Sequence, residues 1–263
     1  DAMYAVLHNG DYHNIERTDL ALDVYALGRT LVTAPGRYGY YMPEWKPYFA
    51  TAGYNTLMVD GSPHQEWGSH PLLLRADLQD TSWRLGNDVD WAWGTHPTGF
   101  DAAPDVRWQR GILFVKGQYW LVIDHIEGPG EHDFSLRWLL TPGNAVQEDG
   151  ELAAHTANSD ANVRLAPALP AGARAAVWSG SREPLRGWYS PENGVMLPAP
   201  QIEYTWRGTA PWAGTAWVEL PWFDIVPASK HPACRGSDGH DLLLLDAEHA
   251  IDLDHEAVGE LLH

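Results

Sequence analysis

Cysteine is nearly absent from this sequence: Cys234 is the only one among 263 residues. A single thiol cannot form an intrachain disulfide, so the cysteine content leaves the redox compartment open. No apolar run approaches the roughly 18 residues that a membrane-spanning helix needs, which excludes such a helix. The sequence also lacks a Gly-x-Ser-x-Gly elbow, a Gly-x-x-x-x-Gly-Lys phosphate loop and a metal-binding cysteine pair. The enzyme classes defined by those motifs therefore find no support.

Basic residues are also few, since 17 Lys and Arg stand against 35 Asp and Glu, for a formal net charge of −18. Nucleic acids and anionic membrane surfaces are bound through clustered cations, so neither is expected as a partner. The simplest role of the excess acid is solubility. An acidic ligand would need a locally basic cleft, and the candidates to form one are His13, Arg17, Arg29 and Arg37.

Tryptophan, in contrast, is abundant, with 14 residues in the chain. Indole rings fill the core of a globular domain or provide flat platforms on which sugar rings stack. The core is the more common place for any one of them. The hydrophobic fraction of 44% is ordinary for a globular protein.

Alternation of apolar and polar residues predicts β-strands along most of the chain. Leu20, Leu22 and Val24 alternate with other residues as in a half-buried strand. Similar patterns, or β-branched and aromatic runs, predict strands at residues 112–115, 119–123, 134–138, 163–165, 175–178, 202–206 and 215–220. Gly28 and Gly117 fall where tight hairpin turns are expected, because glycine adopts positive φ without strain.

Many short strands and no long amphipathic helix before residue 240 predict an all-β fold, a large antiparallel two-sheet β-sandwich. One such domain is expected over residues 1–225. Residues 226–263 are set apart as a C-terminal extension, in which residues 241–263 alternate acids with Leu, Ile and Val. This pattern predicts an acidic C-terminal extension that forms a short helix or a loosely held tail.

A series of short motifs runs through the first part of the chain, at Tyr25, Ala26, Gly28, Arg29, Pro35, Gly36, Asn55, Thr56, Val59, Asp60, Gly61 and Gln65. In this order and spacing the series resembles the C-terminal β-domain of heparinase II/III-like polysaccharide lyases. The similarity continues at residues 110–116, 119–124, 128–132 and 187–194, so that it covers about residues 4–225. It implies a β-sandwich of the supersandwich type.

The resemblance also implies a function, β-elimination on an acidic polysaccharide that contains uronic acid. In the family an N-terminal (α/α) toroid of the same protein supplies further catalytic residues. The toroid and the acidic polysaccharide or oligosaccharide are therefore the expected partners, and the expected location is secreted or periplasmic. The alternative is a non-catalytic carbohydrate-binding or scaffolding sandwich derived from such lyases.

The positions that carry the chemistry in the family are substituted here. Aligned on Tyr25, the two family histidines fall on Asn14 and Glu16. The aspartate that binds metal falls on Ala34, and the histidine before Asn-Thr falls on Tyr54. Because alanine has no ligating atom and zinc needs three or four N, S or O donors, no zinc or other cofactor is predicted.

A uronate lyase must neutralise the sugar carboxylate, remove the C5 proton and protonate the leaving oxygen. His13, Asn14 and Tyr54 are the candidate catalytic residues, because they supply an imidazole, a neutral donor and a phenol. Residues predicted to bind the substrate are Glu16, Arg17, Asn55, Arg37, Trp91 and Trp93. In the structural alternative, Tyr54 only fills an abandoned metal pocket and His13 is a surface residue.

Trp91 and Trp93 are candidates for sugar stacking because they lie beside Asp88 and Asp90. Residues 87–93 as a whole are expected to form a solvated loop. The two acids could also serve a glycosidase or hold calcium.

Overall fold

The computed structural model describes residues 2–8, 20–39, 43–64, 81–96 and 98–220. Within these residues the protein is built of antiparallel strands, with one short π-helical turn, η1 (Tyr48–Ala52). None of the described helical segments is long and apolar enough to cross a membrane. The predicted acidic extension at residues 226–263 lies outside the described residues.

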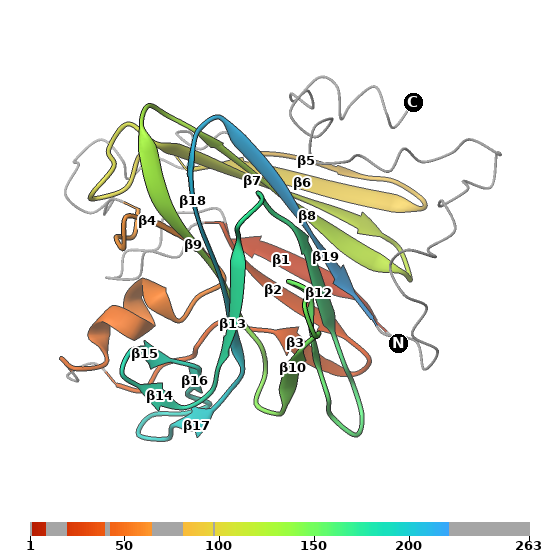
Figure 1. Cartoon of the computed structure of the whole chain (residues 1–263). Helices are drawn as coiled ribbons and strands as arrows, with labels where there is room; N and C mark the ends of the chain where they lie inside the picture. The colour runs from red at the N-terminus through yellow and green to blue at the C-terminus, as the bar shows by residue number, and fades with distance from the viewer. Residues whose placement is uncertain (1, 9–19, 40–42, 65–80, 97, 221–263) are drawn as a thin grey trace.

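The first layer is an eight-stranded sheet with the order β10-β11-β12-β19-β8-β7-β6-β5 (Figure 1). Its strands are β5 (Thr81–Leu85), β6 (Val89–Thr95), β7 (Arg107–Val115), β8 (Tyr119–Glu127), β10 (Ala145–Gln147), β11 (Ala154–Thr156), β12 (Arg164–Ala168) and β19 (Trp212–Glu219).

The second layer combines a four-stranded sheet, β13-β18-β9-β4, with a three-stranded sheet, β1-β2-β3. An isolated bridge between Val32 and Leu140 joins the two sheets. The strands are β1 (Tyr4–His8), β2 (Ala21–Ala26), β3 (Arg29–Val32), β4 (Leu57–Val59), β9 (Glu131–Leu139), β13 (Arg174–Trp178) and β18 (Gln201–Thr209).

Four very short strands and η1 gather at one end of the molecule (Figure 1). They are β14 (Ser181–Arg182), β15 (Leu185–Arg186), β16 (Trp188–Tyr189) and β17 (Leu197–Pro198), which form two hairpins.

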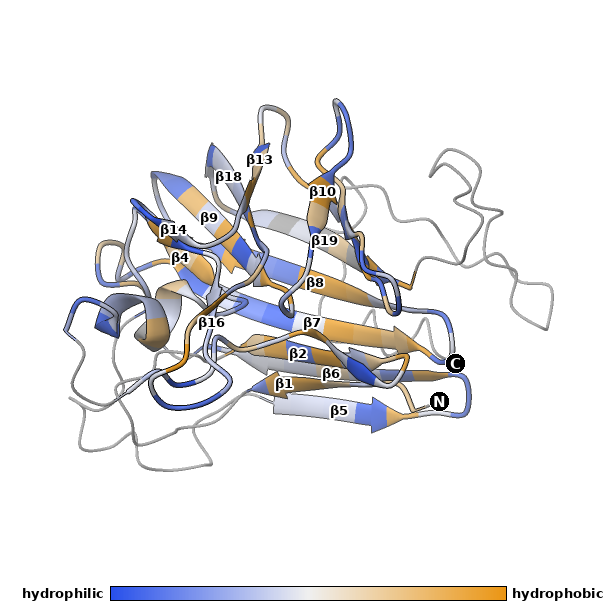
Figure 2. Ribbon diagram, turned by 90° about the horizontal axis from the view of Figure 1, so that it is seen from below, coloured by the Kyte–Doolittle hydropathy of each residue, from blue (hydrophilic) through white to orange (hydrophobic). Residues whose placement is uncertain are grey.

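The core lies between the two layers and is supplied by alternate residues of the long strands. In β8, the inward residues Trp120, Val122, Asp124 and Ile126 are buried, while the residues that alternate with them, Leu121, Ile123 and His125, are half-buried. Trp138 and Tyr204 complete the core from the opposite layer. Figure 2 shows apolar positions running along the strands, with many hydrophilic turns between them. The predicted β-sandwich is thus confirmed, and several tryptophans serve in its core.

Both predicted hairpins are confirmed. Leu27 and Gly28 have φ of 54° and 82°, which lets a two-residue turn join β2 to β3. Gly117 has φ of 75° in the turn between Val115 and Tyr119. The expected loop at residues 87–93 is wrong, because most of it is strand β6. Asp90 closes the preceding turn by accepting hydrogen bonds from Gly86 N–H and Lys116 Nζ, so the acid stabilises a hairpin.

Arg110 is a fully buried cation at the centre of the sandwich. Its guanidinium makes a two-pronged ion pair with Asp124, with N–O distances of 2.7 and 3.0 Å. It also donates to the carbonyl oxygens of Leu20 and Asn55, so it ties the first layer to two segments of the second. The Trp108 indole donates to the same carboxylate. All partners are hydrogen-bonded, which is the condition under which a buried charge is tolerated.

Replacing Arg110 by Met should lower the free energy of unfolding by about 3–5 kcal/mol, because it leaves the Asp124 carboxylate buried without its cation. Urea unfolding measures the change. The matched control is Arg207→Met, which removes an arginine that is 58% exposed and paired with surface acids. The control should lose no more than about 1 kcal/mol. Equal losses for the two variants would contradict the role given to Arg110.

A second ion pair should make stability depend on pH. Asp60 Oδ2 lies 2.7 Å from Nδ1 of His132, and Asp60 Oδ1 accepts the N–H of Asp133. The hydrogen bond that His132 donates to the Asp60 carboxylate favours the protonated ring and raises the pKa of His132. Partial burial alone would raise the pKa of Asp60, but the bonds from Asp133 N–H and His132 outweigh it and lower that pKa.

The lowered pKa of Asp60 contributes stability at pH values above the pKa of an unfolded aspartate, and this contribution is lost as the pH falls. The raised pKa of His132 contributes stability at pH values below the pKa of an unfolded histidine, and this contribution is lost as the pH rises. The stability difference between wild type and His132→Ala should therefore peak between about pH 4 and pH 6.5. In an Asp60→Asn background this peak should vanish. Thermal melts across pH 4–9 measure the effect of His132→Ala in each background. An effect that does not change with pH in the wild-type background would contradict the pairing of Asp60 with His132.

Candidate functional site

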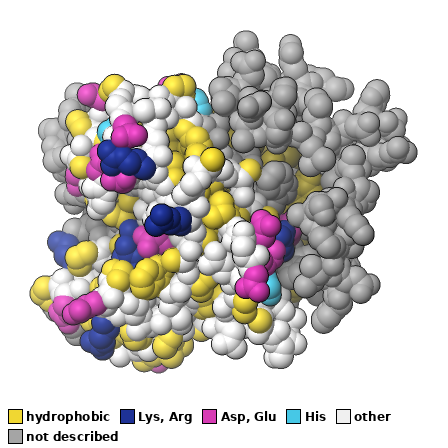
Figure 3. Space-filling model, in the orientation of Figure 1, with side chains coloured by type: hydrophobic (Ala, Val, Ile, Leu, Met, Phe, Trp, Pro, Cys, Tyr) yellow, Lys and Arg dark blue, Asp and Glu magenta, His cyan; other side chains and the backbone are white. Residues whose placement is uncertain are grey.

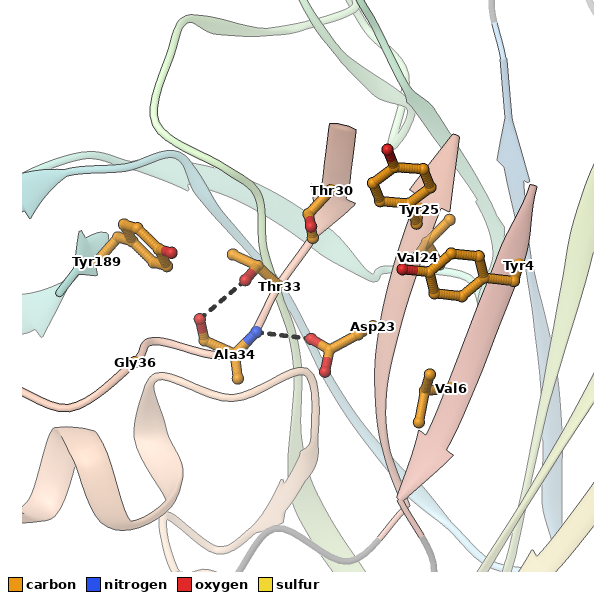
Figure 4. Close-up of a pocket in the computed structure, with 10 residues that line it drawn as sticks. All are labelled: Tyr4, Val6, Asp23, Val24, Tyr25, Thr30, Thr33, Ala34, Gly36 and Tyr189. Carbon is orange, nitrogen blue, oxygen red and sulfur yellow. Dashed lines mark hydrogen bonds between the residues drawn. The ribbon is translucent and has the colours of Figure 1, made fainter. Parts of the chain in front are cut away.

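A pocket of about 340 Å³ lies on the outward face of the β1-β2-β3 sheet (Figure 4). Residues of β1, β2 and β3, of the segment after β3 and of β16 line it. These residues are Tyr4, Val6, Asp23, Val24, Tyr25, Thr30, Thr33, Ala34, Gly36 and Tyr189. The pocket therefore includes Ala34, where the resemblance places a metal ligand.

Two stacked tyrosines form one wall of the pocket. Tyr4 and Tyr25 are direct cross-strand partners, and their rings lie 4.9 Å apart at an interplanar angle of 10°. Their side chains point outward because Val24 and Ala26, the alternate residues of β2, are buried in the core. Tyr4 is 49% exposed, so a large aromatic surface faces solvent at the mouth.

Asp23 is the charged group of the pocket, and two contacts fix its carboxylate. Oδ1 accepts the backbone N–H of Ala34 at 2.8 Å (Figure 4), and Oδ2 lies 2.8 Å from Nε2 of His8. Each carboxylate oxygen has two lone pairs, so both keep capacity to accept further hydrogen bonds. The arrangement presents a rigid acceptor to a ligand with hydroxyl groups.

Gly36 brings the segment after β3 against β16. Its φ is +76°, and a Cβ built there would meet the Ser190 carbonyl oxygen at 2.0 Å. The N–H of Ser190 donates to Pro35 O, which fixes the neighbouring Tyr189 beside the pocket. Only glycine fits such a contact, which explains the Pro-Gly motif in physical terms.

Tyr54 and Asn55 lie inside the protein and do not line the pocket. Tyr54 is 8% exposed and Asn55 is 1% exposed. The Asn55 amide donates to Leu22 O and Thr33 O, and its oxygen accepts from Leu139 N–H. The Asn55 side chain thus holds the backbone beside Asp23 and Ala34. Its predicted contact with substrate stays a prediction.

Of the other predicted site residues, the structure places only Arg37 next to the pocket. His13, Asn14, Glu16 and Arg17 lie outside the described residues. Arg37 is exposed and directly follows Gly36 of the pocket.

Trp91 and Trp93 lie on the outward face of the eight-stranded sheet. Trp93 pairs with Gly111, whose neighbour Arg110 points into the core, and its ring fills the space above Gly111. The pocket belongs to the other layer, so the two tryptophans do not join it.

The residues at the position of the family's metal do not fit zinc. Ala34 offers only backbone atoms, and its N–H is engaged by Asp23. Within the described ranges, no group of three or more His, Cys, Asp or Glu could hold a metal ion. The absence of zinc from the protein in solution stays a prediction.

The polar and aromatic residues of this region that were not predicted from the sequence include Tyr4, His8, Asp23 and Tyr189. The alternation of outward Tyr4, Val6 and His8 with inward Ala5 and Leu7 was an available signal for strand β1. Also not predicted was a fully buried histidine pair, His64 and His96, whose rings lie 4.2 Å apart beneath Trp108.

Positive charge is scarce around the pocket. None of its described lining residues is Lys or Arg. On the face shown in Figure 3, Lys and Arg form separate spots, most of them next to Asp or Glu, and no continuous basic surface. Arg29, one of the candidate cations, is paired with Asp160 at 2.9 Å.

Comparisons with known proteins agree with this architecture. The sequence matches the family model described as "Heparinase II/III-like, C-terminal" over residues 17–234. This match confirms the resemblance carried by the motifs. Comparison with curated proteins by sequence gives no match.

Solved structures of similar fold include a heparinase III and a heparan sulfate lyase. The heparinase III BT4657 gene product has a TM-score of 0.68 at 14% identity, with 85% of this chain and 33% of that chain covered. Heparan sulfate lyase HepC from Pedobacter heparinus has a TM-score of 0.65 at 18% identity, with coverage of 83% and 33%. At these identities the likeness shows a common fold, and the present chain spans about one third of either structure's length.

Asn55→Ala should destabilise the protein by about 2–4 kcal/mol, because it removes the partners of three buried backbone groups beside the pocket. Chemical unfolding measures this loss. Asn144→Ala, at an exposed turn position, is the matched control and should change stability by about 0.5 kcal/mol or less. A loss at Asn55 no larger than that of the control would show that its hydrogen bonds do not hold the pocket wall.

Proposed function

Since this chain belongs to the heparinase II/III-like C-terminal domain family, we propose that it forms the β-sandwich part of a polysaccharide lyase active on uronic-acid-containing chains. The family match over residues 17–234 carries this proposal. The pocket beside Ala34 supports it, since it lies at one of the positions where the family has its chemistry. Secretion or a periplasmic location would suit a polymeric substrate of this kind.

The proposed activity needs more chain than is present here. The lyase structures of similar fold are about three times as long as the matching part, since the match covers 33% of each. We propose that an N-terminal (α/α) toroid of the same parent protein closes the cleft over the sandwich and supplies further groups. By themselves, the 263 residues are expected to bind glycan and not to cleave it.

The proposed chemistry is β-elimination. Asn14, with Arg17, would neutralise the uronate carboxylate so that the C5 proton becomes acidic. His13 would remove this proton, and Tyr54 would protonate the leaving glycosidic oxygen. Glu16, Arg37, Asn55, Trp91 and Trp93 are the proposed substrate-binding residues. No step uses a metal, because Ala34 and Tyr54 do not make a zinc site.

A non-catalytic carbohydrate-binding sandwich is the second candidate. One observation favours it: the tyrosine-lined pocket offers sugar contacts, whereas Ala34, at a position where the family has a metal ligand, has no ligating side chain. The two proposals differ in whether the parent protein breaks glycosidic bonds.

The deciding assay joins this chain to the preceding part of its parent protein and supplies a panel of uronic-acid polymers. Lyase action creates a double bond in the product, which absorbs in the ultraviolet. Product formation supports the lyase. Glycan binding without product, for every polymer, would support the binding module.

Within the lyase proposal, Tyr54→Phe should lower turnover by about 10² or more, because it removes the hydroxyl that transfers a proton. Tyr38→Phe is the matched control, since Tyr38 packs against Trp45 at 5.7 Å through its ring. The control should keep wild-type turnover. Unchanged turnover in Tyr54→Phe would restrict Tyr54 to packing.

A further inference from the structure

We propose that the pocket on the β1-β2-β3 sheet binds an uncharged sugar residue of the polysaccharide, and that the neighbouring uronate lies outside it. This inference rests on the proposed function for the identity of the polymer. It narrows the substrate to a chain in which uronic acid alternates with an uncharged sugar. A polymer of uronate alone would fit the pocket poorly.

The stacked tyrosines provide the apolar half of the site. A pyranose ring has a face of C–H groups that packs on an aromatic ring, with the partial positive charge of the hydrogens toward the π-cloud. Tyr4 is 49% exposed and stacked on Tyr25, which holds its ring in one orientation. A platform held in place before binding loses little entropy when the sugar arrives.

Asp23 provides the polar half. Its carboxylate is fixed by Ala34 N–H and His8 and still has acceptor positions. Sugar hydroxyls are donors, and a hydrogen bond to an ionised acceptor is stronger than one between neutral groups. Thr30 also lines the pocket, and its hydroxyl can complete the polar contacts, whereas the hydroxyl of Thr33 already donates to Ala34 O (Figure 4).

The same carboxylate makes the pocket unsuitable for an acidic sugar. Two carboxylates within one small pocket repel each other unless a cation lies between them. Asp23 is the only charged residue among the described lining residues. The formal charge of −18 adds repulsion at longer range. The uronate carboxylate therefore needs a cation elsewhere in the cleft.

Two ligands that differ at one carbon test the inference: methyl β-glucoside and methyl β-glucuronide, which carry a hydroxymethyl group and a carboxylate at C6. Binding to the whole chain is followed by NMR titration at low salt and at pH 8, where imidazoles are ordinarily neutral. The glucoside should bind about fivefold or more tightly than the glucuronide. Asp23→Asn should abolish this preference by admitting the glucuronide.

Tyr4→Ala should weaken glucoside binding by about tenfold, because it removes the exposed ring of the platform. Trp83→Ala is the matched control, an aromatic residue that is 67% exposed on strand β5 and should leave binding unchanged. Thermal melts verify that each variant is folded. Tighter binding of the glucuronide, no binding of either ligand, or a Tyr4→Ala variant with wild-type affinity would overturn the inference.

The binding test is independent of turnover. Glucoside binding that follows this pattern, together with no lyase activity in the parent protein, would refute the proposed catalysis and retain the pocket. Lyase activity of the parent protein, together with tighter binding of the glucuronide, would support the proposed catalysis and refute the inference about the pocket.

Discussion

The buried guanidinium of Arg110 is the constraint on which the geometry of the candidate site depends. It reaches from the first layer across the core and donates to the carbonyl oxygens of Leu20 and Asn55. Asn55 in turn donates to Leu22 O and Thr33 O. Leu22 directly precedes Asp23, and Thr33 directly precedes Ala34, so both acceptors lie next to pocket residues. An ion pair in the core is therefore connected to the pocket through two successive sets of hydrogen bonds.

This arrangement gives the residues of the family motif a structural role that is separate from any role in catalysis. Asn55 matches the family pattern, and its side chain, which is 1% exposed, bonds to three backbone groups, so its amide stabilises the fold. Pro35 and Gly36 are explained by the contact with Ser190. The residues that match the family pattern are thus those whose role in the fold is clearest. Family membership follows from them, whereas activity does not.

The fold could be predicted from sequence because the long strands alternate regularly, as in residues 119–127, where each second residue is buried. Strand β6 was missed because its outward residues are Trp91 and Trp93 and an inward one is Asp90, the reverse of the usual pattern. The site was harder to predict. The pairing of Tyr4 with Tyr25 and the contact of His8 with Asp23 depend on strand register across 15 or more positions, which local patterns do not specify.

The substitution at Ala34 and the pocket carboxylate form one consistent arrangement. An aspartate at position 34 would place a second carboxylate close to Asp23, whose Oδ1 lies 2.8 Å from the Ala34 nitrogen. Two such groups without a cation repel each other, and one of them would have to take up a proton. With alanine, the backbone N–H of residue 34 donates to Asp23 Oδ1, and position 34 adds no second side-chain acceptor. The pocket therefore presents one carboxylate held in place by Ala34 N–H and His8, which is the acceptor that the proposed sugar contact needs.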